Sequence, residues 1–184
     1  MPLTDDDFKQ AADRLGCEVA AIKSVAEVES GPYGAFLPDG KPVILFERHL
    51  FSRLTKKKYD ATAPDISNPK PGGYGPVSAQ HGRLEKAAAL DKDAAQQSCS
   101  WGRFQVLGMN WKPLGYASLQ EFVDSMYRDE AAHLDSFVRF VETNNLARHL
   151  ISKNWAAFAK GYNGPSYAQY KYDAKLAAAY KKYL

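Results

Sequence analysis

The segment from Ala20 to Gly31, AAIKSVAEVESG, constrains the fold of this chain more than any other stretch. Ile22, Val25 and Ala26 follow one another at helical spacing, which predicts a helix with one apolar, core-facing stripe. Glu29 continues the same series one turn later and therefore falls on that stripe. A serine, a glycine and a proline come next, and this combination ends helices. The segment thus predicts a buried helix whose last turn carries a carboxyl group.

The position of Glu29 disfavours the charged form of its carboxyl group. A helix C-terminus carries partial negative charge, and burial removes the water that would stabilise an anion. A carboxylic acid that keeps its proton near neutral pH can serve as a general acid. Position alone also allows a glutamate that merely caps the helix end or extends to solvent. Glu27, four residues after Lys23, is expected to pair with that lysine on the solvated face.

The size of the chain predicts one domain. It has 184 residues, enough for a sizeable core, and we expect a single domain over residues 1–184. Its 45% hydrophobic and 24% charged residues are typical of a soluble globular protein. No apolar run is long enough to span a bilayer, and the acidic N-terminus lacks the pattern of a secretory signal. The chain is therefore expected in the cytoplasm unless its export depends on something outside the sequence.

The charge and the cysteines argue against several functions. A net charge of +3 and a pI near 8.7 make the surface mildly basic, which is too weak to indicate a nucleic-acid partner. No interleaving of aromatic and basic residues suggests base stacking. Cys17 and Cys99 fit neither a metal site nor a disulfide framework, and we expect both to be free thiols.

The first half of the chain predicts helices around a small β-element. Thr4 and Asp7 form a near capping box at the start of a first helix, which Gly16 ends. A short strand is expected over Val43–Phe46, in a hairpin with the turn-rich segment directly before it. Residues 59–80 contain four prolines and three glycines, so we expect a long loop that can wall or cover a cleft.

From about His81 onward the pattern is almost wholly helical. A capping box at Ser118 and Glu121 opens one long helix or two, and Asn144-Asn145 ends that region. The whole sequence therefore predicts a mainly α fold of the α+β type with a small β-hairpin. Further helices are expected over residues 47–54, 84–90, 146–152, 155–161 and 167–183.

Three separated segments carry a common set of polar residues. They are Glu29-Ser30-Gly31, Gly102-Arg103-Phe104-Gln105-Val106 and Gly161-Tyr162-Asn163-Gly164-Pro165. In this order they resemble the motifs of the lysozyme superfamily, especially its goose-type lysozymes and soluble lytic transglycosylases. In those proteins a helix-ending Glu-Ser is followed by a glycine-led segment ending in Gln-Val or Gln-Ile, and then by a Tyr-Asn turn. The resemblance implies a lysozyme-like fold with a cleft between two lobes.

A closer resemblance extends over nearly the whole chain. The blocks LTDDDFKQAADRLGCEVAAIKSVAEVESG, PVILFERHLFSRL, YDATAPDISNPKPGGYG and FAKGYNGPSYAQYKYDAKLAAAY resemble the N-acetylmuramidase family of bacteriophage endolysins. This implies a glycoside hydrolase that cleaves the β-1,4 bond between N-acetylmuramic acid and N-acetylglucosamine in bacterial peptidoglycan, without a cofactor. The catalytic glutamate of the family carries over to Glu29, the residue that the helical pattern also indicates.

The motif residues near Glu29 are expected to bind the sugar. Gln105 can both donate to and accept from hydroxyl or N-acetyl groups. Tyr162 offers a ring face and a hydroxyl, and Asn163 can orient Glu29 or bind an acetamide. Ser30 is expected to line the same substrate site.

A second carboxylate for the reaction is expected at Glu47, which follows the predicted strand and can lie across the cleft from Glu29. It would activate water, although Arg48 or His49 could equally hold it in a structural ion pair. Asp39 and Asp65 are weaker candidates.

No metal site is expected. Glu47 and His49 alone do not make a zinc signature, and the histidines show no ligand spacing. Each histidine is expected to be an ordinary, partly exposed residue: His49, His81, His133 and His149.

Two other activities stay open. A lytic transglycosylase breaks the same bond but forms a 1,6-anhydro product with the sugar's own hydroxyl. A non-catalytic peptidoglycan-binding module would keep the fold, although a binder has no need of a buried acid. The resemblance implies a monomer that accumulates in the host cytoplasm, without membrane insertion, and reaches peptidoglycan once the inner membrane is breached.

Overall fold

The computed structural model describes residues 2–31 and 33–184, so Pro32 of the expected helix stop lies outside the described residues. The α-helices are α1 (Asp5–Leu15), α2 (Val19–Glu29), α3 (Arg48–Leu54), α4 (Gln80–Ala88), α5 (Lys92–Gln97), α6 (Leu119–Arg128), α7 (Glu130–Thr143), α8 (Ala147–Ile151), α9 (Trp155–Asn163) and α10 (Tyr172–Lys182). The strands are β1 (Ile44–Phe46), β2 (Cys99–Trp101) and β3 (Val106–Leu107). Short 3-10 helices are η1 (Val77–Ala79), η2 (Gly108–Asn110) and η3 (Pro165–Ala168).

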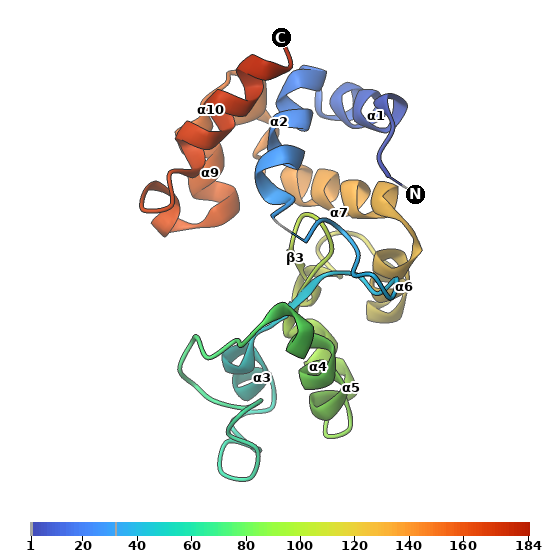
Figure 1. Cartoon of the computed structure of the whole chain (residues 1–184), viewed down its shortest axis with the longest axis vertical. Helices are drawn as coiled ribbons and strands as arrows, with labels where there is room; N and C mark the ends of the chain where they lie inside the picture. The colour runs from blue at the N-terminus through green and yellow to red at the C-terminus, as the bar shows by residue number, and fades with distance from the viewer. Residues whose placement is uncertain (1, 32) are drawn as a thin grey trace.

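Most of the helices form an upper and a lower group, and α6 lies between these groups at mid-height (Figure 1). Helix α10 packs against α2 and α9, and α1 packs against α2 and α7, which together form the upper lobe. Helices α3 and α4 pack against α5 in the lower lobe, and α4 also contacts β1. The mainly helical, two-lobed architecture expected from the sequence is confirmed.

Capping explains why the first helix forms where the sequence predicts it. The Thr4 hydroxyl accepts from the Asp7 N–H at 3.3 Å, and the Asp7 carboxylate accepts from the Thr4 N–H at 2.8 Å. At the other end Gly16 adopts a φ of +67°, a conformation that suits glycine. The helix between them presents Ala11, Ala12 and Leu15 to the core. The capping box is therefore confirmed.

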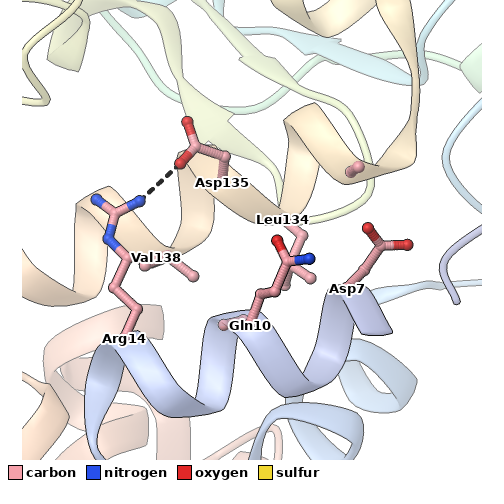
Figure 2. Close-up of a pocket in the computed structure, with 8 residues that line it drawn as sticks. Asp7, Gln10, Arg14, Leu134, Asp135 and Val138 are labelled. Carbon is pink, nitrogen blue, oxygen red and sulfur yellow. Dashed lines mark hydrogen bonds and ion pairs between the residues drawn. The ribbon is translucent and has the colours of Figure 1, made fainter. Parts of the chain in front are cut away.

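Helix α1 is fixed to α7 by charge as well as by packing (Figure 2). The Arg14 guanidinium donates to Asp135 Oδ1 at 2.8 Å and to Glu142 Oε2 at 2.6 Å. Because all three side chains are partly exposed, the ion pairs orient α1 more than they stabilise the fold. Asp7 and Gln10 of α1 face Leu134 and Val138 of α7 across a small pocket.

The small sheet has a different pairing from the one predicted. A single bridge between Phe36 and Pro42 closes the turn before β1, but β1 itself pairs antiparallel with β2, which pairs with β3. The hairpin of the fold is thus β2–β3, more than fifty residues after β1. The predicted hairpin was wrong in its partner because strand pairing across such a separation leaves no local signal.

The expectation of helix from His81 onward was wrong for residues 98–117, which form β2, β3, η2 and connecting turns. The two-helix alternative is correct further on, since Asp129 stands in extended conformation between α6 and α7 and caps α7 through Ala132. Helix α10 begins at Tyr172 rather than at 167, after η3. Proline opens η3 and has no N–H for a continuing helix.

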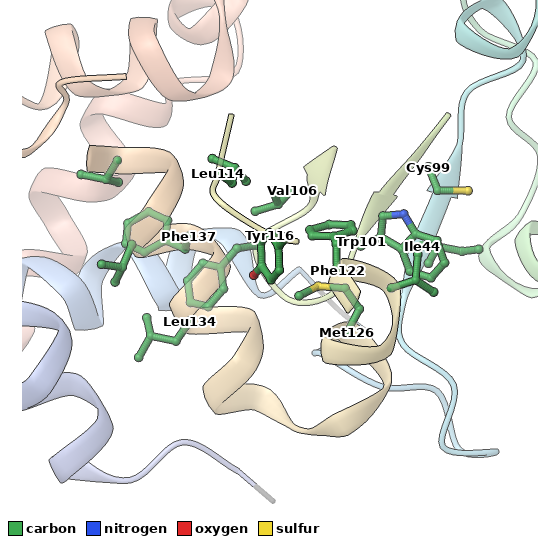
Figure 3. Close-up of a cluster of buried hydrophobic side chains, with 14 of the residues drawn as sticks. Ile44, Cys99, Trp101, Val106, Leu114, Tyr116, Phe122, Met126, Leu134 and Phe137 are labelled. Carbon is green, nitrogen blue, oxygen red and sulfur yellow. The ribbon is translucent and has the colours of Figure 1, made fainter. Parts of the chain in front are cut away.

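A hydrophobic core connects the elements of both lobes (Figure 3). Trp101 of β2 lies edge-on to Phe122 of α6, with ring centroids 6.5 Å apart, and Phe104 stacks on Phe137 of α7 at 4.9 Å.

Cys99 is buried in this core and Cys17 is partly buried, and both are free thiols as expected. Within the described residues, no helix is long and apolar enough to cross a membrane.

Gly102→Ala should destabilise the protein by about 3 kcal/mol. Gly102 has a φ of +67°, and a Cβ there would lie 2.6 Å from Nδ1 of the buried His133 ring. Left-handed strain costs about 1–2 kcal/mol and overpacking about 1–3 kcal/mol. Gly40→Ala is the matched control, because Gly40 has a φ of +80° with open space around it, and should lose only the strain. Denaturant unfolding measures both, and equal losses would contradict the packing argument.

Candidate functional site

The three sequence motifs meet at the ends of two helices. Glu29 is the last residue of α2 and Asn163 the last residue of α9. Asn163 Nδ2 donates to Glu29 Oε1 at 3.0 Å. One residue earlier, the Tyr162 hydroxyl donates to the Phe104 carbonyl oxygen at 2.7 Å, which ties α9 to the middle motif. Segments that are far apart in the sequence thus form one site.

Glu29 lines a groove of about 410 Å³ between helices of the upper lobe and the small sheet. The same glutamate, with Leu45 and Gln105, also lines an adjoining hollow of about 210 Å³. We call these the groove and the side hollow. Around Glu29 the groove is lined by Leu45, Ser100, Phe104, Gln105, Val106, Leu107, Asn110, Phe140, Tyr162, Asn163 and Tyr172. A polymer could therefore pass Glu29 with units on both sides of it.

The register of the sheet decides which side chains face the groove. Leu45 pairs with Ser100, and Ser100 pairs with Leu107, so these three residues share one face. All three line the groove. Ile44 and Trp101 lie on the opposite face of the sheet and are buried in the core.

Burial raises the pKa of the Glu29 carboxyl group above its usual value. The hydrogen bond from Asn163 and the charge of Lys175 act against this shift without cancelling it. The direction agrees with the expectation drawn from the helix pattern.

The partner expected for Glu27 was wrong. Lys182 and Tyr183 of the C-terminal region bind Glu27, whereas Lys23 donates to Asp5.

Glu47 lies immediately after β1 and contacts the groove through a neighbour. The Ser100 hydroxyl donates to Glu47 Oε1 at 3.4 Å, and His49 Nδ1 lies 3.8 Å from Glu47 Oε2. Burial raises the pKa of Glu47, while His49, Ser100 and Arg53 lower it. Glu47 itself lines neither the groove nor the side hollow.

The two weaker carboxylate candidates also lie outside both cavities. Asp65 pairs with Lys86 at 2.7 Å, which lowers the pKa of Asp65. Asp39 accepts from the Lys41 N–H at 3.2 Å and so stabilises the turn before β1.

The expected sugar-binding residues all line the groove or the side hollow, but the protein already uses part of their polar groups. The Ser30 hydroxyl donates to the Ala26 carbonyl oxygen. Gln105 Nε2 donates to the Gly102 carbonyl oxygen at 2.8 Å. Asn163 Oδ1 is buried without a hydrogen-bond partner among the described residues, so it is an acceptor available to a ligand.

Sequence reasoning missed a network that holds the middle motif. The Arg103 guanidinium donates to Glu130 at 2.6 Å and to the Ala26 carbonyl oxygen of α2 at 3.4 Å. The Arg103 backbone N–H donates to His133 Nδ1 at 3.1 Å. The expectation that the histidines are partly exposed was wrong for His133 and His81, which are buried and bond backbone groups. No spacing rule reveals the contacts of Arg103, since each of them crosses 27 or more residues.

Tyr172 is a further groove residue that the sequence pattern did not single out. It begins α10 and was expected only as part of a terminal helix. Across residues 2–31 and 33–184, no three His, Cys, Asp or Glu side chains are grouped so that they could hold a metal ion.

A partly buried carboxyl group at a helix end, inside a groove beside a small sheet, is the arrangement of lysozyme-like glycan-cleaving proteins. Residues 18–184 match the family model Muramidase, described as N-acetylmuramidase, and the chain belongs to this family. It is thus a peptidoglycan-cleaving glycosidase.

Among solved structures, the chain is similar to one described as the crystal structure of Burkholderia AP3 phage endolysin. The match has a TM-score of 0.92 and 44% sequence identity, and it covers 98% of this chain and 71% of that chain. A comparison with curated proteins gave no match.

The raised pKa of Glu29 predicts a pH-dependent effect of Glu29→Gln on stability. Below about pH 4.3 both folded and unfolded chains protonate this group. Above that pH the unfolded chain loses the proton first, so the native wild type loses stability until its own pKa is passed. Glu29→Gln, which is neutral and can still accept from Asn163, should melt above wild type at pH 8, and the two should converge near pH 4.

Glu27→Gln is the control with the opposite sign. Lys182 and Tyr183 lower the pKa of Glu27, so its stabilising effect is present at neutral pH and lost on acidification. This variant should melt below wild type at pH 8. A difference between Glu29→Gln and wild type that does not change with pH would contradict the burial argument.

Proposed function

We propose that this chain is the catalytic domain of a phage endolysin that hydrolyses the β-1,4 bond between N-acetylmuramic acid and N-acetylglucosamine, with Glu29 as general acid. The observation that carries the proposal is the contact between Glu29 and Asn163 inside the groove, where the three motifs meet. The family match and the similarity to a phage endolysin structure support peptidoglycan as the substrate.

Glu29 would donate its proton to the glycosidic oxygen as positive charge develops on the departing sugar ring. Burial favours the protonated carboxyl group at the start of the reaction. Asn163 Nδ2 holds one carboxyl oxygen, which leaves the other oxygen to carry the proton toward the substrate. When Glu29 becomes an anion, the same amide N–H stabilises the negative charge.

Glu47 would activate the attacking water. Its contact with Ser100, which lines the groove, gives a hydrogen-bonded route from the groove to a second carboxylate. Burial raises the pKa of Glu47 and makes its carboxylate a stronger base once the proton is lost. The enzyme would act as a monomer on wall glycan strands, after leaving the host cytoplasm, and without a cofactor.

One observation favours a second candidate, a lytic transglycosylase. Glu29 is the only Asp or Glu among the described residues that line the groove and the side hollow. A transglycosylase needs no second carboxylate, because a hydroxyl of the same sugar attacks the reacting carbon. The products distinguish the two reactions, since hydrolysis adds one water and the anhydro product does not contain it.

Digestion of purified peptidoglycan should give fragments with reducing N-acetylmuramic acid ends, as measured by mass spectrometry. Glu29→Gln should fold normally and lose about 10³-fold in rate, as expected when an essential general acid is removed. Activity within tenfold of wild type, at an unchanged melting temperature, would exclude Glu29 as the acid. A predominance of 1,6-anhydro ends would identify a transglycosylase.

Glu47→Gln should lower turnover about 10²-fold or more while the melting temperature stays within a few degrees of wild type. Steady-state rates per folded molecule and thermal melting measure the two effects. Asp65→Asn is the control, because the Asp65 carboxylate pairs with Lys86, which does not line the groove, whereas Glu47 is bonded by Ser100 of the groove; this variant should keep full activity. Should Glu47→Gln melt early and keep its turnover, Glu47 serves the structure and not the reaction.

A further inference from the structure

Two arginine side chains meet at one glycine in the lower lobe. A Cβ placed on Gly73 would lie 2.6 Å from Cζ of Arg48, so the Arg48 guanidinium lies directly against that residue. Arg83 Nη1 donates to the Gly73 carbonyl oxygen at 3.1 Å, and its Nη2 donates to the Asp65 carbonyl oxygen at 2.7 Å. Arg48 begins α3 and Arg83 lies in α4, and the loop between these helices carries Gly73.

Neither guanidinium is neutralised by a carboxylate of the described residues. Within that part of the chain no ion pair involves either arginine, and the nearby Asp65 carboxylate pairs with Lys86. The Nε atoms of Arg48 and Arg83 are both buried without a hydrogen-bond partner there. Burial lowers the pKa of Arg83, the charge of the nearby Asp65 raises it, and the charge of Arg48 lowers it further, with a net downward shift. Two partly buried cations that repel each other are costly unless an anion joins them.

The glycine keeps this pair in place. Gly73 has a φ of +67°, which favours glycine, and any side chain there would displace the Arg48 guanidinium. The glycines on either side of it, Gly72 and Gly75, have open space at the Cβ position. Of these three glycines, only Gly73 therefore lies in close contact with an arginine side chain.

The two arginines line neither the groove nor the side hollow, but residues close to them in the sequence connect to both cavities. Arg48 directly follows Glu47, whose carboxylate is bonded by Ser100 of the groove. Four residues after Gly73, Val77 lines the side hollow next to Glu29. A glycan strand bound beside Glu29 would therefore reach the arginines only through a substituent that extends beyond both cavities.

We propose that Arg48 and Arg83 bind a carboxylate of the peptide stem that peptidoglycan carries on its muramic acid units. The planar guanidinium fork matches a carboxylate in shape and charge, and the stem is the anionic part of the polymer. This inference rests on the proposed function, because it is the glycan in the groove that brings the stem to these arginines.

The direct test measures binding of a soluble stem peptide by calorimetry, which needs no catalysis. Arg48→Gln should weaken binding about tenfold relative to wild type, in line with loss of a charge-assisted contact. Its melting temperature should stay equal or rise, because Arg48 makes no bond to a described side chain and repels Arg83. Arg148→Gln on α8 is the matched control and should bind as wild type does, since Arg148 is exposed and has no acidic partner among the described residues.

The second measurement compares peptidoglycan with glycan strands from which an amidase has removed the stems. Arg48→Gln should raise KM about tenfold on the intact polymer, keep kcat, and behave as wild type on the stripped strands. Equal binding of the stem peptide by wild type and Arg48→Gln would overturn the proposal. The proposal would also be overturned if inorganic phosphate raised the melting temperature of the wild type, Arg48→Gln abolished this effect, and stem binding stayed unchanged. That outcome would define a phosphate site. Failure of the proposed function would show separately, as absence of wild-type activity on both polymers.

Discussion

The hydrogen bond between Asn163 and Glu29 joins two helix ends that are 134 residues apart in the sequence. Its geometry depends on how α2 and α9 are held, and α10 packs against both of them. The contacts of Lys182 and Tyr183 with Glu27 fix the end of α10 to the same helix that carries Glu29. The C-terminal helix therefore acts as the support that sets the distance between the acid and its amide partner.

A buried carboxyl group keeps its proton more readily when a nearby cation is paired with another anion. Arg103 lies close to the last turn of α2, since it donates to the Ala26 carbonyl oxygen, yet its charge is paired with Glu130. The groups that lower the pKa of Glu29 are Asn163 and Lys175, and Arg103 is not among them. The Arg103–Glu130 pair can thus position the middle motif against α2 without ionising the acid. A site that combines a protonated carboxyl group with a structural arginine has to use the arginine's hydrogen bonds without letting its charge ionise the carboxyl group. A carboxylate partner for the arginine meets both conditions.

The sequence predicted those features that have local causes. The capping box of α1, the stop after Glu29, the break at Asn144-Asn145 and the burial of Glu29 all follow from residues within a few positions. The resemblance supplied the fold, since no local pattern describes a cleft between two lobes. The strands of the short β2–β3 hairpin within residues 98–117 were also missed. The other failures were long-range: β2 as the partner of β1 and the packing that buries His133. Each of these depends on contacts between segments whose separation in sequence no periodicity encodes.

The surroundings of the two glutamates differ in a way that suits the roles proposed for them. Both carboxyl groups have their pKa raised by burial, but the groups that oppose burial differ. Glu29 has one amide donor and a lysine charge against its desolvation, whereas Glu47 has His49, Ser100 and Arg53. A carboxyl group with more partners for its anion loses its proton more readily, and the proposed mechanism needs this of Glu47, while it needs Glu29 to keep its proton. The sheet connects Glu47 to the groove. Its register places Ser100 opposite Leu45 on the groove face, and from there the Ser100 hydroxyl donates to Glu47.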